Sequence, residues 1–203
     1  MDFNYANKYV NKFELTGRVV AIREDHYGNK MVTIFTKNGK DVYLKVRMDK
    51  EVYAAIDGTN HAIVSITGHI VNKRVPSRVE KNKYILAQQF VADIVSPEKT
   101  LTDQYFGVKG KFHLPLSIKI YICGILASSN VNDKGWTRYV VDTFNDKNKK
   151  TSIVTYLGKV DRRPKVNNGD MVCMVCSLST PKKEVNGKAI NYEDIIVSDI
   201  AKA

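Results

Sequence analysis

The sequence predicts an all-β protein made of two copies of one five-stranded barrel. Segments 107 positions apart resemble each other: Leu15–Val19 resembles Ile122–Leu126, and Gly28 falls on Gly135. Apolar and polar residues alternate along Asp41–Met48, as expected for a strand with one buried face. An Asn-Gly dipeptide and other turn signals separate the apolar segments. Because the order of these segments recurs in both halves, a duplicated β fold explains the pattern.

The first copy is expected to hold three strands, a short helix and two further strands. Gly17 in the first strand marks a bulge or a sharp bend. Asp49 can cap the N-terminus of the helix, and Gly58 can stop it. The strands are expected at residues 12–22, 31–36, 41–48, 62–71 and 84–95.

The second copy repeats this order without the helix, because the connection at residues 158–169 is typical of a loop. Its strands are expected at residues 118–127, 137–144, 151–157, 170–178 and 190–201. The predicted organisation is an N-terminal arm (residues 1–11), domain 1 (12–96), a linker (97–116) and domain 2 (117–203).

Three strands, a helix and two more strands, with a long bent first strand, is the layout of the OB-fold, a five-stranded Greek-key barrel. The fold prediction is therefore two tandem OB-fold barrels, with a short helix in the first. Leu15–Val19 and the segment Val64–Arg74 resemble strands of single-stranded DNA-binding proteins of bacterial, phage or plasmid type. The resemblance implies sequence-nonspecific binding and protection of single-stranded DNA in replication, recombination or plasmid or phage transfer.

Bacterial members of that family commonly end in a flexible acidic tail that recruits repair proteins. This chain ends Ser198-Asp-Ile-Ala-Lys-Ala203, directly after its last predicted strand. We therefore expect no recruitment through such a tail, and a phage or mobile-element origin rather than a housekeeping one.

The charge balance points to a polyanionic partner. Lys and Arg total 32 against 21 Asp and Glu, a net charge of +11, which is typical of nucleic-acid binding; a basic surface kept for solubility is the alternative. The 43% hydrophobic content excludes wholesale disorder. With no apolar run of membrane length and no signal peptide at Met1–Tyr5, we expect a soluble cytoplasmic protein with no membrane partner.

The three cysteines are expected to be thiols in the core. Cys173 and Cys176 have CxxC spacing, but positions three apart in a strand point to opposite faces, so a shared metal is not favoured. Cys123 adds a third, an odd number that suits a reducing compartment. We expect no metal and no cofactor.

In the first copy, basic and aromatic residues are predicted to share the outward face used by OB-folds. Single-strand binding needs aromatic surfaces for the bases and cations for the phosphates. The competing interpretation is that the rings cover the barrel and the lysines are solvated. The candidates are Arg18, Phe35, Tyr43, Lys45 and Arg47 on the strands, with Lys73, Arg74 and Arg78 in the hairpin between strands four and five.

In the second copy, the only tryptophan, Trp136, follows a turn and shares its strand face with Arg138 and Phe144. Trp136 could equally be a packing residue at a sheet edge. The next strand leaves open whether Ile153 or Tyr156 faces outward. The remaining candidates are the loop cations Arg162, Lys182 and Lys183.

No sequence motif of a nucleotide hydrolase, serine hydrolase or zinc protease is present, so we expect a binding protein and not an enzyme. Three alternatives remain: an RNA-binding OB protein, a protein–protein adaptor of a replication or conjugation complex, and, least favoured, a metal-dependent nuclease. The arm Met1–Asn11 could mediate self-association or docking on a neighbouring protein.

Overall fold

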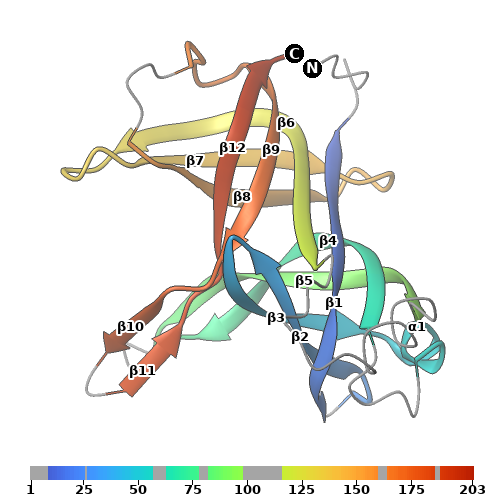
Figure 1. The fold of residues 1–203 in the computed structure, drawn as a ribbon. Coiled ribbons are helices and arrows are strands. Elements are labelled where there is room, and N and C mark those ends of the chain that lie inside the picture. Colours follow the sequence, from blue (N-terminus) through green and yellow to red (C-terminus); the bar gives the residue numbers. More distant parts are fainter. Residues whose placement is uncertain are drawn as a thin grey trace. The chain divides into compact units, whose positions relative to one another are not determined.

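The described part of the chain is all-β apart from one short helix (Figure 1). The structure is a computed structural model that describes residues 9–25, 27–56, 63–77, 82–97, 116–159, 164–185 and 188–203. The elements are β1 (Val10–Glu24), β2 (Lys30–Asn38), β3 (Lys40–Met48), α1 (Lys50–Ala54), β4 (Ile63–Pro76), β5 (Tyr84–Pro97), β6 (Ser117–Val131), β7 (Thr137–Phe144), β8 (Lys150–Leu157), β9 (Met171–Ser179), β10 (Lys182–Val185), β11 (Lys188–Asn191) and β12 (Asp194–Lys202).

The first five strands close into a barrel. They pair in the order β2–β3–β5–β4–β1, and β1 pairs back with β2. The β3–β5 pairing is parallel, with Val46 opposite Phe90. Phe90 and Phe13 are fully buried and meet edge to face, with ring centroids 5.3 Å apart. This closed five-stranded topology is the OB-fold predicted for the first copy.

The helix α1 begins where the sequence predicts. The Asp49 carboxylate accepts a hydrogen bond from the Val52 N–H at 3.2 Å, which caps the first turn. Tyr53 and Ile56 are buried. The predicted stop at Gly58 lies outside the described residues.

Strands β6, β7, β8, β12 and β9, called here the second strand set, pair in that order, and β9 also pairs with β6. The pairing of β8 with β12 is parallel, with Tyr156 opposite Ile196. A separate hairpin of β10 and β11 lies between β9 and β12 in the chain.

Two turns 107 positions apart have the same geometry. Before β2, the Asp25 carboxylate accepts two backbone N–H groups at 2.9 and 3.0 Å. Before β7, the Asn132 side chain accepts two at 3.0 Å each. Gly28 and Gly135 occupy the same place in these turns, each with a φ of 79°, which suits glycine.

The first strands of both sets are also alike. The pairing of β1 with β2 is irregular between Val19 and Ala21, and that of β6 with β7 between Leu126 and Ser128. Gly17 was predicted to mark a bulge or a sharp bend, and the irregularity begins two residues after it. Its absent side chain instead leaves room for the neighbouring strand.

Three sequence predictions about the second half need correction. A single last strand was predicted at residues 190–201; the chain instead forms β11, turns, and begins β12 at Asp194. The Tyr192 N–H donates to the Pro181 carbonyl at 3.0 Å, which closes the β10–β11 hairpin. Lys182 and Lys183 therefore lie in a strand and not in a loop.

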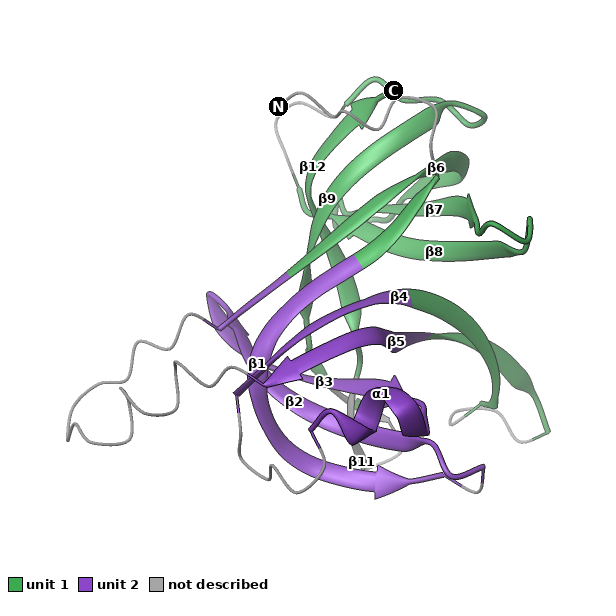
Figure 2. Ribbon diagram, turned by 90° about the vertical axis from the view of Figure 1, so that its right-hand side faces the viewer, with its two compact units in different colours: residues 1–12, 70–88, 119–203 green, residues 13–69, 89–118 purple. Residues whose placement is uncertain are grey.

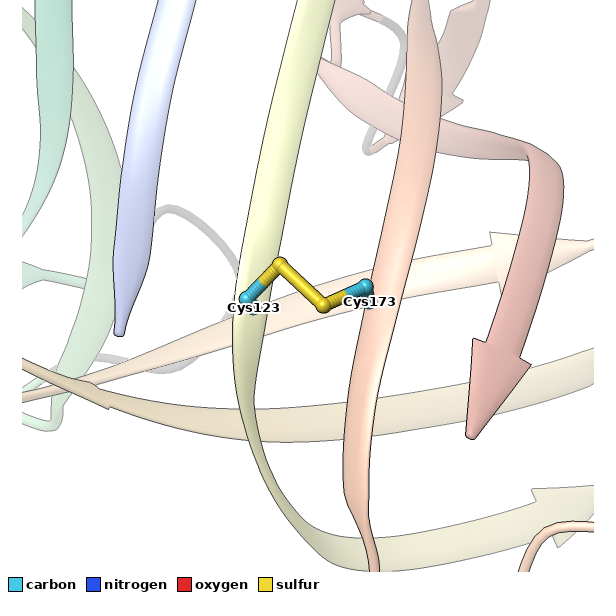
Figure 3. Close-up of a disulfide and its surroundings, with 2 residues drawn as sticks. All are labelled: Cys123 and Cys173. Atoms are coloured by element: carbon cyan, nitrogen blue, oxygen red, sulfur yellow. A yellow bond between two sulfur atoms is a disulfide. The ribbon is translucent and has the colours of Figure 1, made fainter. Parts of the chain in front are cut away.

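The third correction concerns the cysteines. Cys123 of β6 and Cys173 of β9 form a disulfide, with Cα atoms 4.2 Å apart (Figure 3). The two residues are directly opposite in the β6–β9 register, which brings their side chains together. Cys176 is the free, buried cysteine, and burial raises the pKa of its thiol.

The structure divides into two compact units (Figure 2). Unit 2 comprises Phe13–His69 and Gln89–Ile118 and contains the barrel. Unit 1 comprises Met1–Lys12, Ile70–Gln88 and Lys119–Ala203 and contains the second strand set. The described residues of Ile70–Gln88, called here the hairpin arm, therefore belong to unit 1, although β4 begins in unit 2 and β5 ends there. Within the described residues, no helix has the length and apolar character needed to cross a membrane.

Candidate nucleic-acid interface

A row of three side chains crosses the outer face of the barrel. Arg18 of β1 is opposite Phe35 of β2, and Phe35 is opposite Tyr43 of β3. The Arg18 guanidinium carbon lies 5.7 Å from the centre of the Phe35 ring, and the Phe35 and Tyr43 rings are 5.2 Å apart at 50°. Tyr43 is 48% exposed. The row thus offers aromatic surface beside a permanent cation.

Two more cations continue along β3 from Tyr43. Lys45 is exposed, and Arg47 is half-buried with its guanidinium donating to the Asn29 side chain at 3.4 Å. The alternation predicted for this strand is confirmed, because Val42, Leu44 and Val46 are buried. Tyr43, Lys45 and Arg47 therefore share the outer face, called here with Arg18 and Phe35 the barrel face.

The hairpin arm holds a second aromatic–cation pair. The Arg74 guanidinium lies 4.7 Å from the centre of the Tyr84 ring, and Tyr84 is 58% exposed. Lys73 beside it is exposed. Arg78 lies outside the described residues. Sequence reasoning missed Tyr84, although its place opposite the basic end of β4 could have indicated it.

A side chain of the arm pairs with the backbone of β8. The Gln88 Nε2 donates to the Val154 carbonyl at 3.2 Å, and the Val154 N–H donates to the Gln88 Oε1 at 2.5 Å. Asn11 pairs with Ile70 in the same two-way manner, at 2.7 and 3.0 Å. At each end of the hairpin arm, a side-chain amide thus makes the two hydrogen bonds that the backbone of a neighbouring strand would make.

In the second strand set, Trp136 lies at the start of the outer face of β7 and β8, called here the β7–β8 face. It is 39% exposed, and its indole lies over Gly158, whose Cβ, if present, would be 3.7 Å from the ring. Arg138 is exposed and opposite Tyr156, which also points outward. The parity left open by the sequence is resolved, because Ile153 is fully buried.

The remaining predicted binding residues of unit 1 differ in how exposed they are and in whether the structure describes them. Phe144 is half-buried, with its ring centroid 4.9 Å from that of Tyr9, so part of its surface is covered. Lys182 is exposed on β10. Lys183 lies on the same strand, its side chain outside the described part, and Arg162 is outside the described residues altogether.

The centre of the β7–β8 face holds a carboxylate, that of Asp142. Asp142 accepts a hydrogen bond from the Ser152 hydroxyl at 2.6 Å. It also forms an ion pair with the Lys150 Nζ at 3.1 Å. Its side chain is 17% exposed. Sequence reasoning did not single out Asp142, although its strand position places it on the same face as Arg138.

Away from these faces, one acidic group of unit 1, Asp170, has a lowered pKa. The hydrogen bond from the Lys202 Nζ, at 2.7 Å, and a second from the Asn167 N–H lower the pKa of the Asp170 carboxyl. Among the described residues, no group of three or more His, Cys, Asp or Glu is arranged to hold a metal ion.

Comparison with known proteins shows a shared fold. No protein-family model and no curated protein sequence matches the chain. Among solved structures, it is similar to the wild-type single-stranded DNA binding protein from Thermus aquaticus, with a TM-score of 0.62, 13% identity, and coverage of 97% of this chain and 94% of that one. A deletion mutant of the same protein gives a TM-score of 0.63 at 11% identity, with 97% and 95% coverage.

Proposed function

We propose that this protein binds single-stranded DNA without sequence preference and has no catalytic activity. The barrel face carries the proposal: Phe35 and Tyr43 offer ring surface for bases, while Arg18, Lys45 and Arg47 offer charge for phosphates. The shared fold supports it, because the similar solved chains are single-stranded DNA binding proteins. The net charge of +11 suits the same partner.

We further propose that the second strand set is a second OB-fold barrel, which makes the protein a tandem repeat of domains 12–96 and 117–203. The β6–β9 pairing and the parallel β8–β12 contact support this, since the barrel has the equivalent β1–β4 and β3–β5 pairings. Two such folds give a binding site on the order of 8–30 nucleotides. A cytoplasmic role in replication, recombination or plasmid or phage transfer, with self-association through residues 1–11, completes the proposal.

A competition titration tests the function. Unlabelled oligo-dT, the matching RNA and duplex DNA of equal length compete for the protein against labelled oligo-dT, at two salt concentrations. Oligo-dT is expected to compete best and to remain intact, and log K against log[salt] to fall with a slope of about −0.7 per phosphate neutralised. Better competition by RNA would reassign the substrate, and equal or better competition by duplex would contradict the proposal.

Charge removal on the barrel face sharpens the test. Lys45→Ala is expected to weaken binding and to make the salt slope shallower by about 0.7, because one phosphate contact is lost. Lys50→Ala in α1 is the matched control, since it removes the same charge from an exposed position of the same unit but off the barrel face. Equal effects of the two variants would show that only overall charge matters.

A further inference from the structure

The barrel face and the β7–β8 face place opposite chemistry at the same position. Asp142 is opposite Ile125 and Ser152, as Phe35 is opposite Arg18 and Tyr43. Asp142 is 107 residues after Phe35, the spacing that also relates the equivalent turns and glycines. A row of cation, ring and ring is thus replaced by a row of aliphatic chain, carboxylate and hydroxyl.

The carboxylate makes the centre of the β7–β8 face unsuitable for a nucleic-acid strand. It has no aromatic surface on which a base could stack, and its charge offsets that of a cation which would otherwise attract a phosphate. That cation is the Lys150 ammonium group, whose Nζ lies 3.1 Å from the Asp142 carboxylate. The Ser152 hydroxyl, at 2.6 Å, fixes the carboxylate in place.

Exposed aromatic and cationic groups instead gather at the end of the face near the Asn132 turn, whereas the Phe144 ring at the other end is partly covered by Tyr9. Arg138 is opposite Tyr156, at the place where the barrel has Met31 opposite Arg47. Trp136 stands two residues before Arg138 and is partly exposed. The two faces therefore differ in the position of their aromatic rings as well as in the chemistry at their centres.

We infer that Asp142 confines base stacking on the β7–β8 face to its Trp136–Tyr156 end, so that each chain holds a single strand through one complete stacking face and one partial one. This inference rests on the proposed function. It assigns Asp142 a role as a specificity determinant that excludes the strand from the centre of the face.

Removing the charge of Asp142 tests the inference. Asp142→Asn keeps the side-chain shape and an oxygen for the Ser152 hydroxyl, while it frees Lys150 for a phosphate. Affinity for oligo-dT at low salt is expected to rise about 2- to 5-fold. Asp199→Asn is the control, because it makes the same charge change at an exposed position of β12 in the same unit; we expect less than about a 1.5-fold change there. Equal effects of the two variants would overturn the inference.

The reciprocal change places the acidic chemistry on the barrel face. Phe35→Ala removes a ring, and Phe35→Asp removes the ring and adds the carboxylate. Phe35→Asp is expected to bind oligo-dT about 2- to 5-fold more weakly than Phe35→Ala, with circular dichroism confirming that both variants fold. Equal affinities would contradict the excluding role of a carboxylate at this position.

The results separate this inference from the function on which it rests. If the wild-type protein does not bind oligo-dT, both fall together. If it binds, but Asp142→Asn does not exceed Asp199→Asn, the single-strand binding stands and only the division between the two faces is wrong.

Discussion

The barrel and the second strand set share their backbone devices but differ in the side chains they turn outward. Both have a glycine in the first strand, an irregularity two residues later and a turn closed by an acidic or amide side chain. On the outer faces, Phe35 of the barrel corresponds to Asp142 of the second strand set. The difference teaches that two strand sets can share the residues that set strand geometry while their exposed faces carry different chemistry.

The same contrast extends to the first and fourth strands of each set. Cys123 and Cys173 are bonded across β6 and β9. In the barrel, the equivalent opposite pair is Thr16 and Ser65, whose hydroxyl oxygens are 3.4 Å apart. A covalent link in one set thus stands where the other has a hydroxyl contact.

The largest expected effect comes from breaking this link. Replacing Cys123 and Cys173 together by Ser should lower the free energy of unfolding by about 2–4 kcal/mol, because the disulfide closes a 50-residue span of the chain. Replacing Thr16 and Ser65 together by Ala should cost about 1 kcal/mol, the usual value of one hydrogen bond. Urea unfolding measures both, and equal losses would show that the disulfide stabilises the protein no more than the hydroxyl contact does.

The two strand glycines should give matching effects. A Cβ on Gly17 would meet the Ile34 side chain and the Phe35 carbonyl oxygen, and one on Gly124 would meet the Asp142 carbonyl oxygen. Gly17→Ala and Gly124→Ala are each expected to destabilise the protein by about 1–3 kcal/mol, since a backbone atom must shift. Thermal unfolding checks this. A neutral Gly124→Ala beside a destabilising Gly17→Ala would contradict the equivalence of the two sets.

The smallest expected effect is at Trp136. One face of the indole lies over Gly158, so a base can reach only the other, and Trp136→Ala should weaken oligo-dT binding by about 1 kcal/mol with little change in thermal stability. Because Trp136 is the only tryptophan, its fluorescence reports directly on the site. An unaltered spectrum at saturating oligo-dT would remove Trp136 from the interface and leave the barrel face alone.

Much of the strand pattern could be predicted because it is local. The predicted bounds of Thr137–Phe144 agree with β7, and the alternation along Asp41–Met48 placed Tyr43 outward. The β10–β11 hairpin was missed because its polar, lysine-containing sequence shows no apolar alternation. The outward direction of Tyr156 was left open because the Ser and Thr residues around it can face either way.

The sequence by itself determined which side chains of the clearly alternating strands point inward and where the glycine turns occur. A strand alternates its faces with a period of two, and glycine alone readily adopts the φ of 79° seen at Gly28 and Gly135. These are properties of neighbouring residues, so a single chain segment reveals them.

Only the tertiary structure decided which distant side chains meet. Cys123 and Cys173 bond because the β6–β9 register sets them opposite each other, and Gln88 pairs with Val154 across 66 positions of sequence. Tyr9 covers part of Phe144 in the same way. Register between strands depends on the packing of the whole sheet, and a shift of one residue would exchange every pair, so no local pattern could fix these contacts.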